Sequence, residues 1–189
     1  AEGLSEFARI AREENTLPFA ESLEYEIDLM VERSEHVVDS WVMAGAKRLI
    51  IHVESGNFGA VLNTLKGRHI KNGEQQYSFG VELGIALSAD TDVSTIEPYL
   101  EEVSFVQCMG IARIGFQGEP FDERIFERLS RLRAEHPALI LSVDGGVRQE
   151  NARALVEAGA NRLVSGSALF ESDSLKEALR QLRRSAENI

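Results

Sequence analysis

The sequence has 189 residues, enough for one domain with a hydrophobic core and too few for two ordinary domains. Hydrophobic residues make up 43% and charged residues 27%, as in a typical globular protein, so collagen-like and low-complexity classes are excluded. The formal net charge of −11 disfavours binding to nucleic-acid phosphates and to anionic lipid surfaces.

Cysteine content and apolar runs bear on localisation. Cys108 is the single cysteine, which excludes an internal disulfide and favours a reducing compartment. No apolar run approaches the roughly 20 residues that a membrane helix needs. The first ten residues lack the cationic and apolar regions of a signal peptide. We therefore expect a cytoplasmic protein with neither a membrane nor a nucleic-acid partner.

Short apolar runs alternate with amphipathic stretches along the whole chain. The runs are rich in Val, Ile, Leu and Phe and mostly do not alternate with polar residues, so they predict strands buried on both faces. These predicted strands are Glu24–Val31, Arg48–Glu54, Ser78–Leu87, Ser104–Met109, Leu139–Asp144 and Arg162–Ser165. Apolar residues spaced at i, i+3 and i+4 predict helices over Leu4–Glu14, Ser34–Ala44, Glu123–His136, Glu150–Ala158 and Leu175–Arg184.

This alternation predicts an α/β fold with a parallel sheet, because parallel strands need helical crossovers. An open doubly wound sheet accommodates six strands, whereas a TIM (βα)8 barrel needs eight strands and about 250 residues. The predicted helix ahead of the first strand indicates a barrel entered after its second strand. We therefore expect residues 1–189 to form a single, partial TIM-barrel domain that supplies strands 3–8 and helices 2–8.

The most informative motif is Asp144 followed by Gly145 and Gly146. A carboxylate at the carboxyl end of a parallel strand lies where barrel enzymes place their active sites. Glycines let backbone amides approach a ligand closely. The structural alternative is that Asp144 caps the next helix and the glycines only turn the chain.

Two further glycine motifs follow predicted strands. Gly166 and Ser167 come after the last strand and open a short helical turn, where backbone amides can bind phosphate. The loop that contains Gly115 and Gly118 follows the strand ending at Met109, and such loops often close over ligands. A flexible connector would have the same composition.

Seven segments resemble the ribulose-phosphate 3-epimerase family in order and approximate spacing. They are Asp28–Val31, His52–Glu54, Gly84–Leu87, Gly115–Gly118, Ser142–Val147, Ala158–Asn161 and Val164–Ala168. The resemblance implies a TIM barrel that interconverts pentulose 5-phosphates at C3 through an enediolate. It also implies a divalent metal (Zn, Fe, Mn or Mg), held by two histidines and two aspartates, and a homo-oligomer.

The resemblance carries roles to particular residues. Asp144 matches a catalytic aspartate that is also a metal ligand. The phosphate-binding positions match Gly145, Gly146, Gly166 and Ser167, and the substrate-covering loop matches Gly115, Phe116, Gln117 and Gly118. Met30 and Met109 match methionines that line the site, although each would equally well fill a core.

The sequence departs from the family at two places. Asp28 stands where the family has a metal-ligand histidine; it would either bind a harder metal such as Mg²⁺ or Mn²⁺ or pair with a cation from a neighbouring strand. The strand that supplies the other histidine and the first aspartate has no counterpart, so we expect a fragment of a longer protein or a degenerate relative. His52 would face the barrel mouth or lie in the core, and Arg113 would reach a phosphate or lie in solvent.

Two other functions remain open from the residues alone. One is a lyase or synthase of the same superfamily, although its Asp-x-Lys-x-x-Asp pattern is absent. The other is a non-catalytic phosphate-binding relative that has lost the metal site.

Overall fold

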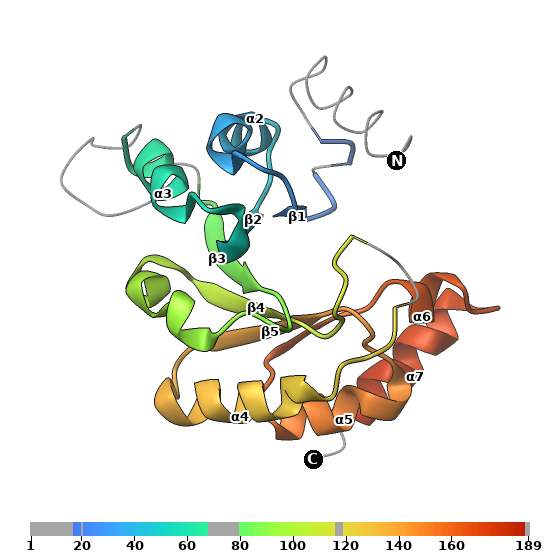
Figure 1. The fold of residues 1–189 in the computed structure, drawn as a ribbon. Coiled ribbons are helices and arrows are strands. Elements are labelled where there is room, and N and C mark those ends of the chain that lie inside the picture. Colours follow the sequence, from blue (N-terminus) through green and yellow to red (C-terminus); the bar gives the residue numbers. More distant parts are fainter. Residues whose placement is uncertain (1–16, 20, 68–79, 116–118, 188–189) are drawn as a thin grey trace. The chain divides into compact units, whose positions relative to one another are not determined.

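The computed structural model describes residues 17–19, 21–67, 80–115 and 119–187. They divide into two compact units with the boundary between Gly84 and Ile85, and each unit is described by itself (Figure 1). The helix predicted over Leu4–Glu14 lies outside the described residues. Within the described ranges, no helix has both the length and the apolar character needed to cross a membrane.

The first unit is built around two paired parallel strands. Its elements are β1 (Glu26–Leu29), the 3₁₀ helix η1 (Ser34–His36), α2 (Val38–Met43), β2 (Arg48–His52), the 3₁₀ helix η2 (Val53–Ser55), α3 (Phe58–Gly67) and the beginning of β3 (Glu82–Leu87). β1 and β2 pair with Asp28 opposite Ile50. The fully buried side chains of Val38, Leu49, Ile51 and Val61 form its core.

The second unit continues from β3 through the remaining strands and their helices. Its further elements are η3 (Val93–Thr95), η4 (Glu97–Glu102), β4 (Phe105–Met109), α4 (Arg124–Glu135), β5 (Ile140–Asp144), α5 (Gln149–Glu157), β6 (Arg162–Val164), α6 (Ser167–Phe170) and α7 (Leu175–Glu187). β5 pairs in parallel with β4 on one side and with β6 on the other. In Figure 1, α4 and α5 lie side by side along one face of these strands.

The helices of this unit pack as their sequence pattern predicts. α4 buries Ile125, Leu129 and Leu132, which lie at i, i+4 and i+7 on one helical face. All five residues of β4 are buried, as expected for a strand covered on both faces. The apolar faces of the helices therefore hold the strands whose carboxyl ends carry the predicted site.

All six predicted strands are confirmed, with slightly shorter bounds. A strand ends where its ladder pairing ends, and apolar composition does not mark that point. The helix predicted over Ser34–Ala44 is divided into η1 and α2 at Val37. Between β3 and β4 the chain forms the 3₁₀ helices η3 and η4 instead of a longer helix. The helix α3 was not among the predicted elements.

Candidate active site

The carboxyl end of β5 brings the predicted catalytic carboxylate beside a residue of β4. Asp144 is the last residue of β5 and stands in register with Met109, the last residue of β4. The amide of Gly110 donates a hydrogen bond of 2.7 Å to the carbonyl oxygen of Asp144. The ends of the two strands are therefore held together at the edge where parallel α/β proteins bind ligands.

Two glycines follow Asp144 because the backbone and its neighbours exclude a side chain. Gly145 and Gly146 have φ values of 98° and 67°, in the left-handed region that favours glycine. A Cβ atom at Gly145 would lie 2.8 Å from a side-chain carbon of Ile111. At Gly146 it would lie 3.0 Å from the ring of Phe121. The sequence prediction of a tight glycine turn after the carboxylate is confirmed in its backbone geometry.

Two residues before the end of each strand lies a buried polar pair to which the sequence analysis gave no role. Gln107 and Ser142 face each other in register on β4 and β5, and both are buried. The Ser142 hydroxyl donates to Gln107 Oε1 at 3.4 Å, and Gln107 Nε2 donates to the sulfur of Met109 at 3.9 Å. The signal available in the sequence was a polar residue inside each of two otherwise apolar strands. Met109, which accepts this weak contact, is itself buried at the end of β4.

The predicted phosphate motif lies after β6. Gly166 precedes the four-residue helix α6, which begins at Ser167. The hydroxyl of Ser165 donates a 3.0 Å hydrogen bond to the carbonyl oxygen of Val147 and so joins the segments that follow β5 and β6. A Cβ atom at Gly166 would meet no atom of the described residues within 4 Å, in contrast to the crowded Gly145.

The predicted covering loop is described only at its base. Gly115 has a φ of 81°, whereas Phe116, Gln117 and Gly118 lie outside the described residues. Arg113 donates from Nε to Glu119 Oε2 at 3.0 Å, across the two sides of the loop. Arg113 therefore forms an ion pair at the base of the loop.

In the first unit, the predicted site residues Asp28 and His52 lie close to each other and to Glu54. Met30 follows β1 and is partly exposed. Asp28 Oδ1 lies 3.2 Å from Nε2 of His52, the last residue of β2, and Nδ1 of His52 lies 3.5 Å from Glu54 Oε2. Burial alone lowers the pKa of His52, and the two carboxylates more than offset this effect, raising the pKa to about 9. Asp28 therefore lies beside a side chain of the neighbouring strand, and its role as a metal ligand stays a prediction.

The described side chains do not by themselves fit a divalent metal. Nowhere in the described ranges are three or more His, Cys, Asp or Glu side chains grouped so that they could hold an ion. The carboxylate of Asp28 lies 3.2 Å from Nε2 of the buried His52, and neither ring nitrogen of His52 makes a hydrogen bond within the described residues.

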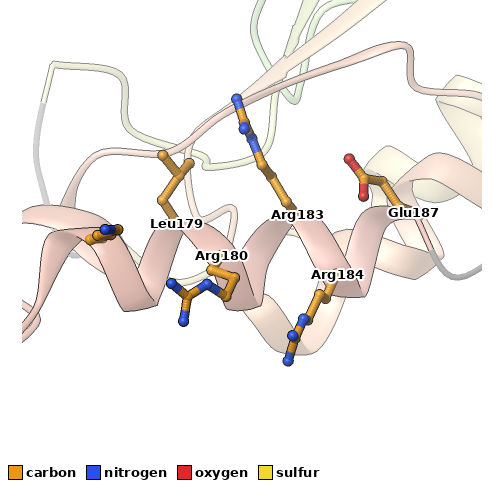
Figure 2. A pocket seen from close by; sticks show the side chains of 6 residues that line it. Leu179, Arg180, Arg183, Arg184 and Glu187 are labelled. Atoms are coloured by element: carbon orange, nitrogen blue, oxygen red, sulfur yellow. The ribbon is translucent and has the colours of Figure 1, made fainter.

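A hollow on the surface of the second unit lies away from the predicted residues. It has a volume of about 430 Å³ and is lined only by side chains of α7, namely Lys176, Leu179, Arg180, Arg183, Arg184 and Glu187. Figure 2 shows Arg183 pointing to one side of the helix and Arg180 and Arg184 to the other. Because these cations diverge, the hollow does not form an anion site.

Comparison with known proteins identifies the family. The model of the ribulose-phosphate 3 epimerase family matches residues 13–170. The ribulose-phosphate 3-epimerase of Bacillus subtilis (strain 168) is 30% identical over 169 residues, which cover 86% of this chain and 72% of that protein. The chloroplastic ribulose-5-phosphate-3-epimerase of Arabidopsis thaliana is 33% identical over 167 residues, covering 86% of this chain and 56% of that protein.

Solved structures support the fold class. A 3-hexulose-6-phosphate synthase superposes with a TM-score of 0.68 at 20% identity, covering 98% of this chain and 81% of that one. KGPDC from Streptococcus mutans also gives a TM-score of 0.68, at 15% identity, covering 89% of this chain and 75% of that one. The predicted α/β fold of the TIM-barrel class is confirmed. Its strands, its glycine turn after Asp144 and the family match over most of its length show that the chain belongs to the ribulose-phosphate 3-epimerase family, a family of isomerases.

Proposed function

We propose that this chain catalyses the interconversion of D-ribulose 5-phosphate and D-xylulose 5-phosphate at C3, with Asp144 as an acid–base residue. The observation that carries the proposal is the position of Asp144, at the carboxyl end of β5 between Met109 and a turn of two glycines. The names of the relatives supply the substrate class.

The reaction needs a base on one face of C3 and an acid on the other. The C3 proton is acidic because C2 is a carbonyl carbon. When the Asp144 carboxylate takes this proton, the electrons of the C–H bond form the C2–C3 double bond and negative charge moves to O2. A proton from water added to the opposite face of C3 would give the epimer, and the proton on Asp144 would pass to water, so atoms and electrons balance. The family's first aspartate, which would return that proton, has no counterpart in this sequence.

Substrate phosphate would bind the glycine-rich ends of β5 and β6. The proposed contacts are the backbone amides of Gly145, Gly146, Gly166 and Ser167, since neutral amides bind a dianion at low desolvation cost. Two observations support this: the Ser165–Val147 hydrogen bond links the two segments, and among the residues that the structure describes none has an atom within 4 Å of the place of a Cβ atom at Gly166. The roles that the family resemblance gives to Met30 and to the loop from Gly115 to Gly118 stay predictions.

A divalent metal is implied by the family, and it would supply charge stabilisation at O2 and O3. Asp144 has the oxygen donors for this role, whereas the described residues contain no complete ligand set. No step above depends on a metal, and Asp144 as a metal ligand remains a prediction.

The test is deuterium incorporation at C3 of ribulose 5-phosphate in D₂O, followed by NMR. We expect exchange with the wild-type chain and a loss of at least about 100-fold with Asp144→Asn, because acid–base catalysis contributes about this much or more. Asp173→Asn serves as the matched control, since it removes an exposed carboxylate outside the proposed site and should leave the rate unchanged. Exchange that survives in Asp144→Asn would refute the role of Asp144.

Absence of exchange in the wild-type chain would favour one of two other functions. A lyase or synthase would consume another sugar phosphate, and it is supported only by the fold of the structural neighbours. A non-catalytic relative would bind ribulose 5-phosphate without turning it over, which calorimetry detects. Cytoplasmic location and a homo-oligomer also remain predictions of ours.

A further inference from the structure

The side chain of Asn151, in the first turn of α5, forms two hydrogen bonds to the backbone that follows Asp144. Its Nδ2 donates to the carbonyl oxygen of Gly146 at 2.9 Å. Its Oδ1 accepts a bond of 2.8 Å from the backbone amide of Arg148. Only one orientation of the side-chain amide serves both partners, because one of them accepts and the other donates. Asn151 therefore bridges the peptide group before Val147 and the peptide group after it.

The two glycines ahead of Val147 depend on such a bridge for a fixed geometry. Glycine has more backbone freedom than any other residue, and Gly145 and Gly146 both adopt φ values in the left-handed region. In a planar trans peptide, the carbonyl of one residue and the amide of the next point in opposite directions. The hydrogen bond from Asn151 to the carbonyl of Gly146 therefore fixes the peptide plane that leaves this glycine.

We infer that Asn151 is a positioning residue that holds the amides of Gly145 and Gly146 in the orientation that binds the substrate phosphate. The inference rests on the proposed function, in which these amides contact the phosphate. A site that is ordered in advance binds more tightly, because the ligand does not have to supply the cost of ordering it. Loss of this order weakens substrate and transition state alike, so KM rises and kcat stays nearly the same.

The competing explanation is that Asn151 only caps α5. Its Oδ1 accepts from the backbone amide of Arg148, the residue that precedes the helix, and this bond is a capping interaction. The two roles use different atoms, since the cap needs Oδ1 and the proposed positioning needs Nδ2. Asn151→Asp separates them, because aspartate keeps an acceptor for the Arg148 amide and has no donor for the Gly146 carbonyl. A negative charge in the first turn also stabilises a helix.

The experiment compares the wild type, Asn151→Asp and Gln149→Glu in the whole chain at pH 7.5. Gln149→Glu is the matched control, because it adds the same charge at an exposed position in the first turn of α5 and leaves the Asn151 side chain in place. ¹⁵N relaxation gives the order parameters of the Gly145 and Gly146 amides without substrate. Calorimetry gives the Kd of ribulose 5-phosphate, the exchange assay gives KM and kcat, and urea unfolding gives the stability.

We expect Asn151→Asp to lower the order parameters of both glycines and to raise Kd and KM about 3- to 10-fold, as for the loss of one hydrogen bond. Its kcat should stay within about twofold, and its urea midpoint should equal that of the wild type. Gln149→Glu should match the wild type in every measurement.

Unchanged glycine order in Asn151→Asp would overturn the inference, whether or not stability falls. So would an equal rise of Kd in Gln149→Glu, which would assign the effect to charge alone. A wild type that does not bind ribulose 5-phosphate would instead refute the proposed function, while the order parameters measured without substrate still show whether Asn151 fixes the glycines.

Discussion

Glycines that look alike in the sequence have different tasks in the structure. Gly145 has a φ of 98°, and a Cβ atom at this position would lie 2.8 Å from a side-chain carbon of Ile111. Gly166 has a φ of −107° and a ψ of −83°, and no atom of the described residues stands within 4 Å of the place of a Cβ atom. Crowding therefore explains Gly145, whereas no neighbouring side chain excludes a Cβ atom at Gly166, to which we assign phosphate binding.

This difference predicts opposite results for two alanine substitutions. Gly145→Ala should lower the free energy of unfolding by about 1–3 kcal/mol, because it adds backbone strain and overpacking. Gly166→Ala should leave the free energy of unfolding within about 0.5 kcal/mol and raise the KM for the sugar phosphate. Urea unfolding and the exchange assay measure the two quantities. Equal loss of stability in both variants would contradict the assignment of Gly166 to phosphate binding.

At the scale of elements, one arginine of α4 joins the segments that lead into β5 and β6. Arg133 donates hydrogen bonds of 2.8 Å to the carbonyl oxygens of Pro137, Leu139 and Gly159. It also donates to the side chain of Asn161, which accepts a bond from the amide of Leu141. These contacts lie at the amino ends of the strands, where residues of a barrel support stability rather than catalysis.

Arg133→Ala should therefore destabilise the fold without affecting the proposed chemistry. We expect a loss of about 1–3 kcal/mol, since several carbonyl oxygens lose a charged donor. Arg131→Ala is the matched control on the same helix, because its exposed ion pair with Glu135 contributes about 0.5 kcal/mol or less. Urea unfolding compares the two variants, and a similar loss in both would show that the Arg133 contacts are not stabilising.

At the scale of the whole molecule, the reactivity of the single thiol measures how readily the second unit opens around β4. Cys108 lies in β4 and is completely buried, and burial raises its pKa to about 12. The thiolate that reacts with disulfide reagents is therefore scarce in the folded protein and inaccessible. Labelling requires the chain to open around β4.

We expect Cys108 to react with a disulfide reagent at pH 8 slowly in native buffer and completely in denaturant, as measured by absorbance. Ser130→Cys places a second thiol on the exposed face of α4, and that thiol should react at once. Rapid labelling of the wild type would contradict the closed core around β4.

Local patterns in the sequence determined the α/β class and the position of the main predicted site. Buried strands and amphipathic helices have periodicities that can be read residue by residue, and all six predicted strands are confirmed. The motif that starts at Asp144 was also local, since the carboxylate and its glycine turn are adjacent in the chain.

Contacts between distant residues were decided by the tertiary structure alone. The register of β1 on β2 joins Asp28 to His52, and pairing of β4 with β5 puts Gln107 opposite Ser142. Ile111 follows the end of β4, and its side chain lies against Gly145, which follows the end of the neighbouring strand β5. Sequence periodicity shows which face of a strand is buried, but it does not show which residue of the neighbouring strand lies opposite. That pairing places the carboxylate of Asp28 3.2 Å from the buried His52, a neighbour that the sequence alone did not name.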